Sequence, residues 1–168
     1  MRSARWIALS VVLAGGAAGA AAPAMAQEAP RAPGADTVAS VDEVVRSGLE
    51  EVAGAFAWAW SEAHLDRIRD HLAPSPQRIR IQLGPSQHTG LTRRQAAAAL
   101  GSVLETRRAG HSELEQVTVA GGNPERGFAE VVWSSVPTGT RQRVTYTVYV
   151  GFLRVEEEWR VTEVRVFR

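Results

Sequence analysis

The sequence predicts a single α+β domain, in which three helices pack on a strongly curved antiparallel sheet of four to five strands. Residues 40–107 contain three segments with apolar residues at helical spacing. Residues 113–167 instead alternate apolar and polar residues, in segments separated by turns rich in Gly, Pro and Asn. The 168 residues include no cysteine, so packing alone must stabilise the fold.

The first 26 residues have the three-part layout of a secretory signal peptide. Arg2 and Arg5 give a positive start, an apolar run follows over residues 6–22, and small residues precede an expected cleavage site between Ala26 and Gln27. A membrane anchor is the alternative, but the run is shorter than the roughly 20 residues that span a bilayer. We therefore expect an exported protein, periplasmic or secreted, with no membrane attachment after cleavage.

Residues 27–39 are rich in Pro and Ala and are expected to form a flexible tether before a domain over residues 40–168. The whole chain has a net charge of +1, and loss of Arg2 and Arg5 with the signal peptide leaves about −1. A near-neutral surface of mixed charge argues against nucleic acid as a partner.

Capping residues mark the first two predicted helices. Ser40 and Glu43 form a capping box ahead of a long amphipathic stripe that ends at Trp60. Ser61 is expected to cap a second, shorter helix, which Pro74 ends.

A third helix is predicted after a turn and lead-in over residues 84–90, where no strand is expected. Thr92 and Gln95 form its capping box. The helix is expected to end near Arg107, whose charge suits the negative end of the helix dipole, and Gly110 can close it.

The strands are predicted from alternation and from β-branched and aromatic residues. They cover residues 77–83, 113–119, 128–136, 143–155 and 159–167. The long segment 143–155 is expected at the centre of the sheet, and the three glutamates after it mark a hairpin tip.

This order of elements resembles the nuclear transport factor 2-like (NTF2-like) superfamily, which includes SnoaL-like proteins. Three stretches contribute: residues 71–75 at the end of the second helix, residues 90–96 at the start of the third, and the terminal hairpin over residues 147–165. They are similar to a branch of short exported members of unassigned function. The resemblance covers residues 40–168 and implies a cone-shaped pocket, with homodimers through the outer face of the sheet.

Enzymes of this superfamily include ketosteroid isomerases, scytalone dehydratases and polyketide cyclases, which place Asp, His or Tyr in the pocket as acid or base. No such pattern matches this sequence residue by residue. Tyr146, on the apolar face of a strand, and His71, at a helix end, are the best candidates for such chemistry. The alternatives are a core tyrosine and a protonated histidine that complements the helix dipole.

Four aromatic residues are expected to line the pocket, or to form an ordinary core: Phe56, Trp60, Trp133 and Tyr146. Trp58 points away from the apolar stripe of its helix. The histidines and carboxylates show no spacing suited to a metal, and no phosphate-binding or dinucleotide-binding glycine motif is present. We therefore expect no metal and no cofactor.

These observations favour a non-catalytic domain that binds a small apolar ligand or a protein partner. A pocket enzyme of the isomerase, dehydratase or cyclase type is the first alternative. A purely structural or assembly domain, with a filled interior, is the second.

Overall fold

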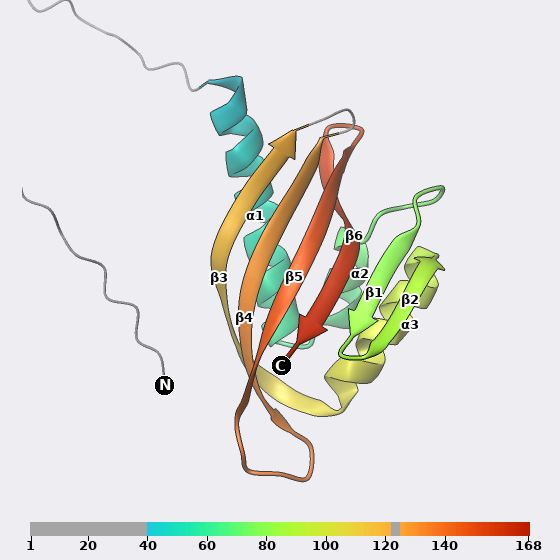
Figure 1. Ribbon diagram of the computed structural model, residues 1–168, viewed down its shortest axis with the longest axis vertical. Helices are drawn as coiled ribbons and strands as arrows, with labels where there is room; N and C mark the ends of the chain where they lie inside the picture. Colours follow the sequence, from blue (N-terminus) through green and yellow to red (C-terminus); the bar gives the residue numbers. More distant parts are fainter. Residues whose placement is uncertain (1–39, 122–124) are drawn as a thin grey trace, which may run out of the picture. The chain divides into compact units, whose positions relative to one another are not determined.

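A computed structural model describes residues 40–121 and 125–168, so the predicted signal peptide, its cleavage site at Ala26 and Gln27, and the tether lie outside the described residues. The helices are α1 (Val41–Ser61), α2 (Leu65–His71) and α3 (Arg93–Glu105) (Figure 1). The strands are β1 (Ile79–Leu83), β2 (Ser86–Leu91), β3 (Arg107–Gly121), β4 (Arg126–Pro137), β5 (Val144–Val155) and β6 (Glu158–Phe167).

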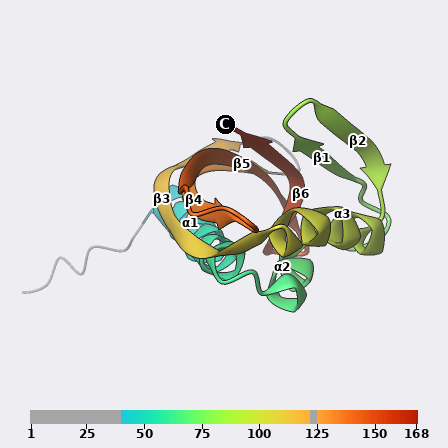
Figure 2. The same cartoon turned by 90° about the horizontal axis from the view of Figure 1, so that it is seen from below.

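The strands form one curved sheet in the order β2-β1-β6-β5-β4-β3. Strand β1 runs parallel to β6, with Ile81 beside Val164, and the other neighbours are antiparallel. Viewed from below, β3 to β6 form an arc, and the three helices lie along its open side (Figure 2). The α+β class, the three helices, the strong curvature and the inner position of β5 confirm the sequence prediction.

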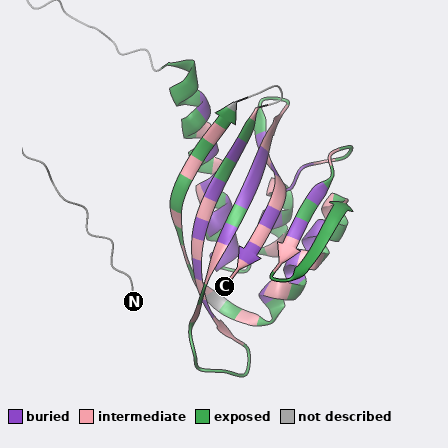
Figure 3. Cartoon of the chain, in the orientation of Figure 1, coloured by how far each residue is buried: buried purple, intermediate pink, exposed green. Residues whose placement is uncertain are grey.

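The sheet differs from the prediction in strand number and direction. The described residues form six strands where four to five were expected, and the sheet is mixed. The additional strand is β2, which lies at one edge and is exposed over nearly its whole length (Figure 3). Because β2 buries no face, its sequence lacks the alternation from which a strand is recognised.

The core lies between the concave face of the sheet and the helices. Alternate residues of β4 and β5 point inward, and they include Val131, Trp133, Val148 and Val150, none more than 1% exposed. Helix α1 covers them with residues at helical spacing. Its buried residues are Val45, Leu49, Ala53, Phe56, Ala57, Ala59, Trp60 and Ser61.

The helix caps agree only in part with the prediction. The Ser40 hydroxyl accepts a bond from the Glu43 amide, and Thr92 with Gln95 forms the expected reciprocal capping box. Ser61 was wrongly assigned as the cap of α2: it is the last residue of α1, and its Oγ donates to the carbonyl oxygen of Trp58 at 2.8 Å. Helix α2 therefore starts without a side-chain cap.

The predicted end of α3 was also wrong, because the helix stops at Glu105 and Arg107 begins β3. Gly110, expected to close the helix, lies within β3. A Cβ atom at this position would overlap the carbonyl oxygen of Ser134 on β4. The glycine therefore allows the two strands to approach closely.

Candidate functional site

The four aromatic residues predicted to line the pocket meet in one row on the concave side of the sheet. The ring centroids of Phe56 and Trp60, one helical turn apart on α1, are 5.9 Å apart. Trp60 meets Trp133 of β4 edge to face at 5.4 Å, and Trp133 lies 5.3 Å from Tyr146. Trp133 and Tyr146 are also cross-strand partners of β4 and β5, so the sheet register fixes this contact.

Arg107 stands at the Tyr146 end of this aromatic row. One of its terminal nitrogens donates to the Tyr146 hydroxyl at 2.6 Å. The guanidinium carbon lies 4.3 Å from the centre of the Tyr146 ring and 5.4 Å from that of Trp133. A cation over aromatic faces is favourable, and more so where water is scarce.

Sequence reasoning missed Arg107 because it assigned this residue to the end of a helix. The only signal that could have found it is the inward and outward alternation of β3. That alternation is interrupted by irregularities between Arg108 and His111 and between Leu114 and Gln116. A bulge changes which residues face inward, so counting along the strand fails.

Several hydrogen-bond donors beside the row have no partner among the described residues. They are the indole nitrogens of Trp60 and Trp133, the hydroxyl of Ser135 and the Nε atom of Arg107. Trp60, Trp133 and Ser135 are each 1% exposed. By contrast, the buried indole of Trp159 donates to a backbone oxygen of α1 at 3.3 Å. Buried polar groups nearly always have a partner in protein, ordered water or a ligand, so these donors mark where such a partner would bind.

His71 lies at the other end of the row, its ring 6.3 Å from that of Phe56. Partial burial lowers the pKa of His71, and the positive charges of Arg160 and Arg67 act in the same direction, against the opposing effect of Asp70. The imidazole is therefore neutral near pH 7, which opposes the interpretation as a protonated helix cap. His71 and Tyr146, the two acid-base candidates, contact different members of the row and are not brought together.

Four hollows in the described part of the chain lie away from the aromatic row. One of about 590 Å³ separates the start of α1 from β3. Three others, of about 350, 150 and 170 Å³, open on the outer face of the sheet, and none of the four is lined by the aromatic row. Phe128 and Tyr149 are 47% and 43% exposed on this outer face. The expected homodimer through this face stays a prediction.

No protein-family model matches the sequence, and neither does any curated protein. Solved structures do match. A putative dehydratase from the NTF2-like family of Streptomyces avermitilis gives a TM-score of 0.60 at 9% identity, over 74% of this chain and 96% of that one. This chain has an NTF2-like fold.

Two further structures with related folds support this assignment. A ketosteroid isomerase-like protein from Erwinia carotovora atroseptica gives a TM-score of 0.60 at 14% identity, over 72% of this chain and 93% of that one. A protein with a ketosteroid isomerase-like fold from Catenulispora acidiphila, in complex with trimethylamine, gives 0.55 at 15% identity, over 70% and 85%. NTF2-like folds commonly bind small ligands or act as isomerases or dehydratases.

Two further observations bear on the NTF2-like domain. Within residues 40–121 and 125–168, no helix combines the length and apolar character that crossing a bilayer requires. The same residues bring no three His, Asp or Glu side chains together in a group that could hold a metal ion.

Proposed function

We propose that this protein is exported and binds a small, flat, largely apolar ligand inside its NTF2-like cone, without catalysing a reaction. The observation that carries the proposal is the set of donors without a partner among the described residues, on Trp60, Trp133, Ser135 and Arg107. Three are nearly fully buried, on Trp60, Trp133 and Ser135. Leaving such groups without a partner costs about 1–3 kcal/mol each, and an acceptor on a bound ligand would recover that energy.

The chemistry of these donors limits the ligand. An indole nitrogen and a guanidinium can only donate hydrogen bonds, so the ligand must bring acceptors such as a carbonyl or a carboxylate. The positive charge of Arg107 favours the carboxylate, and the faces of Trp133 and Tyr146 favour a flat apolar body. A binding role is preferred to catalysis because His71 and Tyr146 are held at opposite ends of the aromatic row.

Indole N–H resonances test this proposal one tryptophan at a time. The protein starting at Gln27 is labelled with ¹⁵N and titrated with benzoate, 2-naphthoate, indole-3-acetate and their neutral amides. We expect the Trp60 and Trp133 signals to move with the carboxylates, because their N–H groups gain an acceptor. The Trp58 and Trp159 signals serve as internal controls and should stay in place, since Trp58 is 56% exposed and Trp159 is already bonded.

A matched variant separates ligand binding from general perturbation. Arg107→Gln removes the charge but keeps a donor, so it should weaken carboxylates more than amides. If all four indole signals stay fixed across the panel, the cone is filled and the structural alternative is preferred.

Export is tested by mass. A mature chain that begins at Gln27, recovered outside the cytoplasm, is the expected result. An uncleaved chain found only with membranes would contradict it.

A further inference from the structure

The three hollows on the outer face of the sheet form one continuous depression, here called the outer furrow. The largest, near β1, shares Phe128, Gly151 and Glu163 with the next one. That one shares Phe128 and Tyr149 with the last, which also touches Gln116 of β3. The outer furrow therefore crosses the strands from β1 over β6, β5 and β4 to β3.

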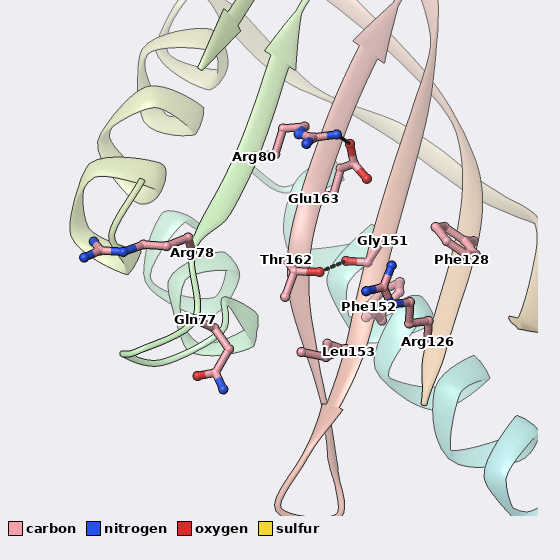
Figure 4. A pocket seen from close by; sticks show the side chains of 10 residues that line it. All are labelled: Gln77, Arg78, Arg80, Arg126, Phe128, Gly151, Phe152, Leu153, Thr162 and Glu163. Carbon is pink, nitrogen blue, oxygen red and sulfur yellow. Dashed lines mark hydrogen bonds and ion pairs between the residues drawn. The ribbon is translucent and has the colours of Figure 1, made fainter. Parts of the chain in front are cut away.

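Two local features open the outer furrow at its middle. Gly151 of β5 has no side chain to fill it. The pairing of β5 with β6 also shifts between Gly151 and Phe152, which leaves Thr162 as an additional residue on β6. The Thr162 hydroxyl donates to the carbonyl oxygen of Gly151 at 3.4 Å (Figure 4). Bulges of this kind locally bend a strand, and they often lie next to functional sites.

The outer furrow is rich in arginine at its β1 end. Arg80 reaches across from β1 toward Glu163 at 3.6 Å (Figure 4). Arg165 binds the same carboxylate at 2.7 Å. Glu163 is thus shared by two guanidinium groups. Arg126 lies over β5, Arg78 extends outward from the rim, and neither makes an ion pair within the described residues.

We propose that the outer furrow binds an acidic segment of a partner protein in an extended conformation. Four arginines line the furrow and two carboxylates, those of Glu163 and Glu130, oppose them, so positive charge is in excess on this surface. Complementary charge steers and orients such a partner. The homodimer expected from the family resemblance would use this same face, so the two occupants compete for it. A second copy of the chain would bring the same positive surface, whereas an acidic segment supplies negative charge.

The dimensions and the apolar middle of the outer furrow indicate what this segment looks like. Four strand spacings separate β1 from β3, which is about 19 Å at ~4.8 Å each. An extended chain of about six residues covers that length. Phe128 and Tyr149 are partly exposed beside the hollow of about 150 Å³ over Gly151. The segment therefore carries acidic residues at one end and an aromatic residue near its middle.

Fluorescence anisotropy with labelled peptides tests this inference on the protein starting at Gln27. The probe is Asp-Glu-Glu-Phe-Gly-Ser, and the controls are Asn-Gln-Gln-Phe-Gly-Ser and Asp-Glu-Glu-Ala-Gly-Ser. We expect saturable binding of the probe, at least about tenfold weaker binding of each control, and loss of affinity as salt rises from about 0.05 to 0.5 M. Equal binding of the probe and its amide control would overturn the proposal.

Variants then locate the binding. Arg126→Gln should weaken the probe about fivefold, the value of a good exposed ion pair. The matched control is Arg94→Gln, which replaces an exposed arginine on α3 that does not line the furrow and should leave affinity unchanged. Equal effects of the two substitutions would show non-specific attraction and would contradict the proposal.

Two other occupants are distinguished in the same experiments. Sedimentation that shows a dimer disrupted by Arg126→Glu would make the furrow an interface between copies of the chain, against the proposal. Citrate that displaces the probe at the probe's own concentration would make it a site for free acids, also against it. The indole signals of Trp60 and Trp133 should not respond to the peptide, so the outcome is independent of the cone ligand.

Discussion

The two faces of the same strands differ in what they can tolerate. On the concave face, Trp133 and its neighbours are closed off from water, and their unpaired donors are part of the core. On the convex face, Phe128 and Arg126 are exposed and contribute little to packing. Stability and the proposed ligand binding therefore depend on the same residues inside the cone. Residues of the outer furrow, the proposed peptide site, can be replaced at little cost in stability.

The largest difference between the faces is expected from truncating an aromatic ring of the cone. Trp133→Ala should lower the free energy of unfolding by about 3–5 kcal/mol, because it leaves a large cavity beside Trp60 and Tyr146. Urea unfolding followed by far-UV circular dichroism measures this. Trp58→Ala is the matched control. Trp58 is 56% exposed and, within the part of the chain that the structure describes, its ring stacks on His64 alone, so the loss should stay below about 1 kcal/mol.

Two glycines differ in whether the structure has room for a side chain at their position, and alanine substitutions test this difference. Gly110→Ala should destabilise by about 1–3 kcal/mol, because its Cβ would overlap a backbone oxygen of β4, which cannot move aside cheaply. Gly54→Ala, on α1, meets nothing within 4 Å and should instead stabilise by about 0.5–1 kcal/mol. Thermal melts of both variants measure the change in melting temperature, which should be negative for Gly110→Ala and positive for Gly54→Ala. Changes of the same sign would contradict this prediction.

The bond between Arg107 and Tyr146 should appear as coupling between the two residues. Tyr146→Phe should cost about 1 kcal/mol in the natural chain, because the guanidinium loses an acceptor. In an Arg107→Met background the same change should cost almost nothing. A double-mutant cycle from urea midpoints measures the coupling, and strict additivity would show that the bond contributes nothing.

The pKa of His71 predicts how stability depends on pH. Because its folded-state pKa lies below the ordinary value, the unfolded chain binds more protons near that range. The stability from the neutral ring is therefore complete above about pH 6.5 and is lost as pH falls toward the lowered value. His71→Gln should flatten this part of the profile, and a profile as steep as that of the natural chain would contradict the assignment.

The smallest effect is expected on the convex face. Arg126→Gln should change the free energy of unfolding by no more than about 0.5 kcal/mol, because this exposed guanidinium has no ion-pair partner among the described residues. The measurement is the urea midpoint at constant slope. A loss of more than about 1 kcal/mol would show that the two faces are not as different as the structure indicates.

The elements that bury one regular face were predictable from sequence. The capping box of Thr92 correctly predicted the start of α3. The alternation around Tyr146 correctly predicted that its ring lies on the inner face of β5. The aromatic row followed from the same periodicity, because Phe56 and Trp60 share a helical stripe. Periodicity reports burial, so it succeeds wherever burial is regular.

The remainder depends on contacts between distant residues or on irregular backbone. The parallel pairing that joins Arg80 to Glu163 has no local signal. Arg107 was hidden by irregular pairing in β3. Thr162, which lines the outer furrow, is an additional residue in β6 that results from a similar irregularity. In the sequence, a charged residue such as Arg126 cannot be told from an ordinary solvated side chain, because the fold decides which charged residues become neighbours.

The parallel pairing of β1 with β6 also bears on how the chain reaches its native state. Strand β6 lies between the β1–β2 hairpin and the other three strands, and Ala73 as well as Arg80 depends on it for pairing. The β1–β2 hairpin therefore has no sheet to join until the last strand, Glu158–Phe167, has been synthesised. Such long-range closure slows folding. A nonsense mutation just before this strand would divide the sheet in two instead of trimming its edge, and it would leave a chain that exposes its apolar surfaces to aggregation and proteolysis.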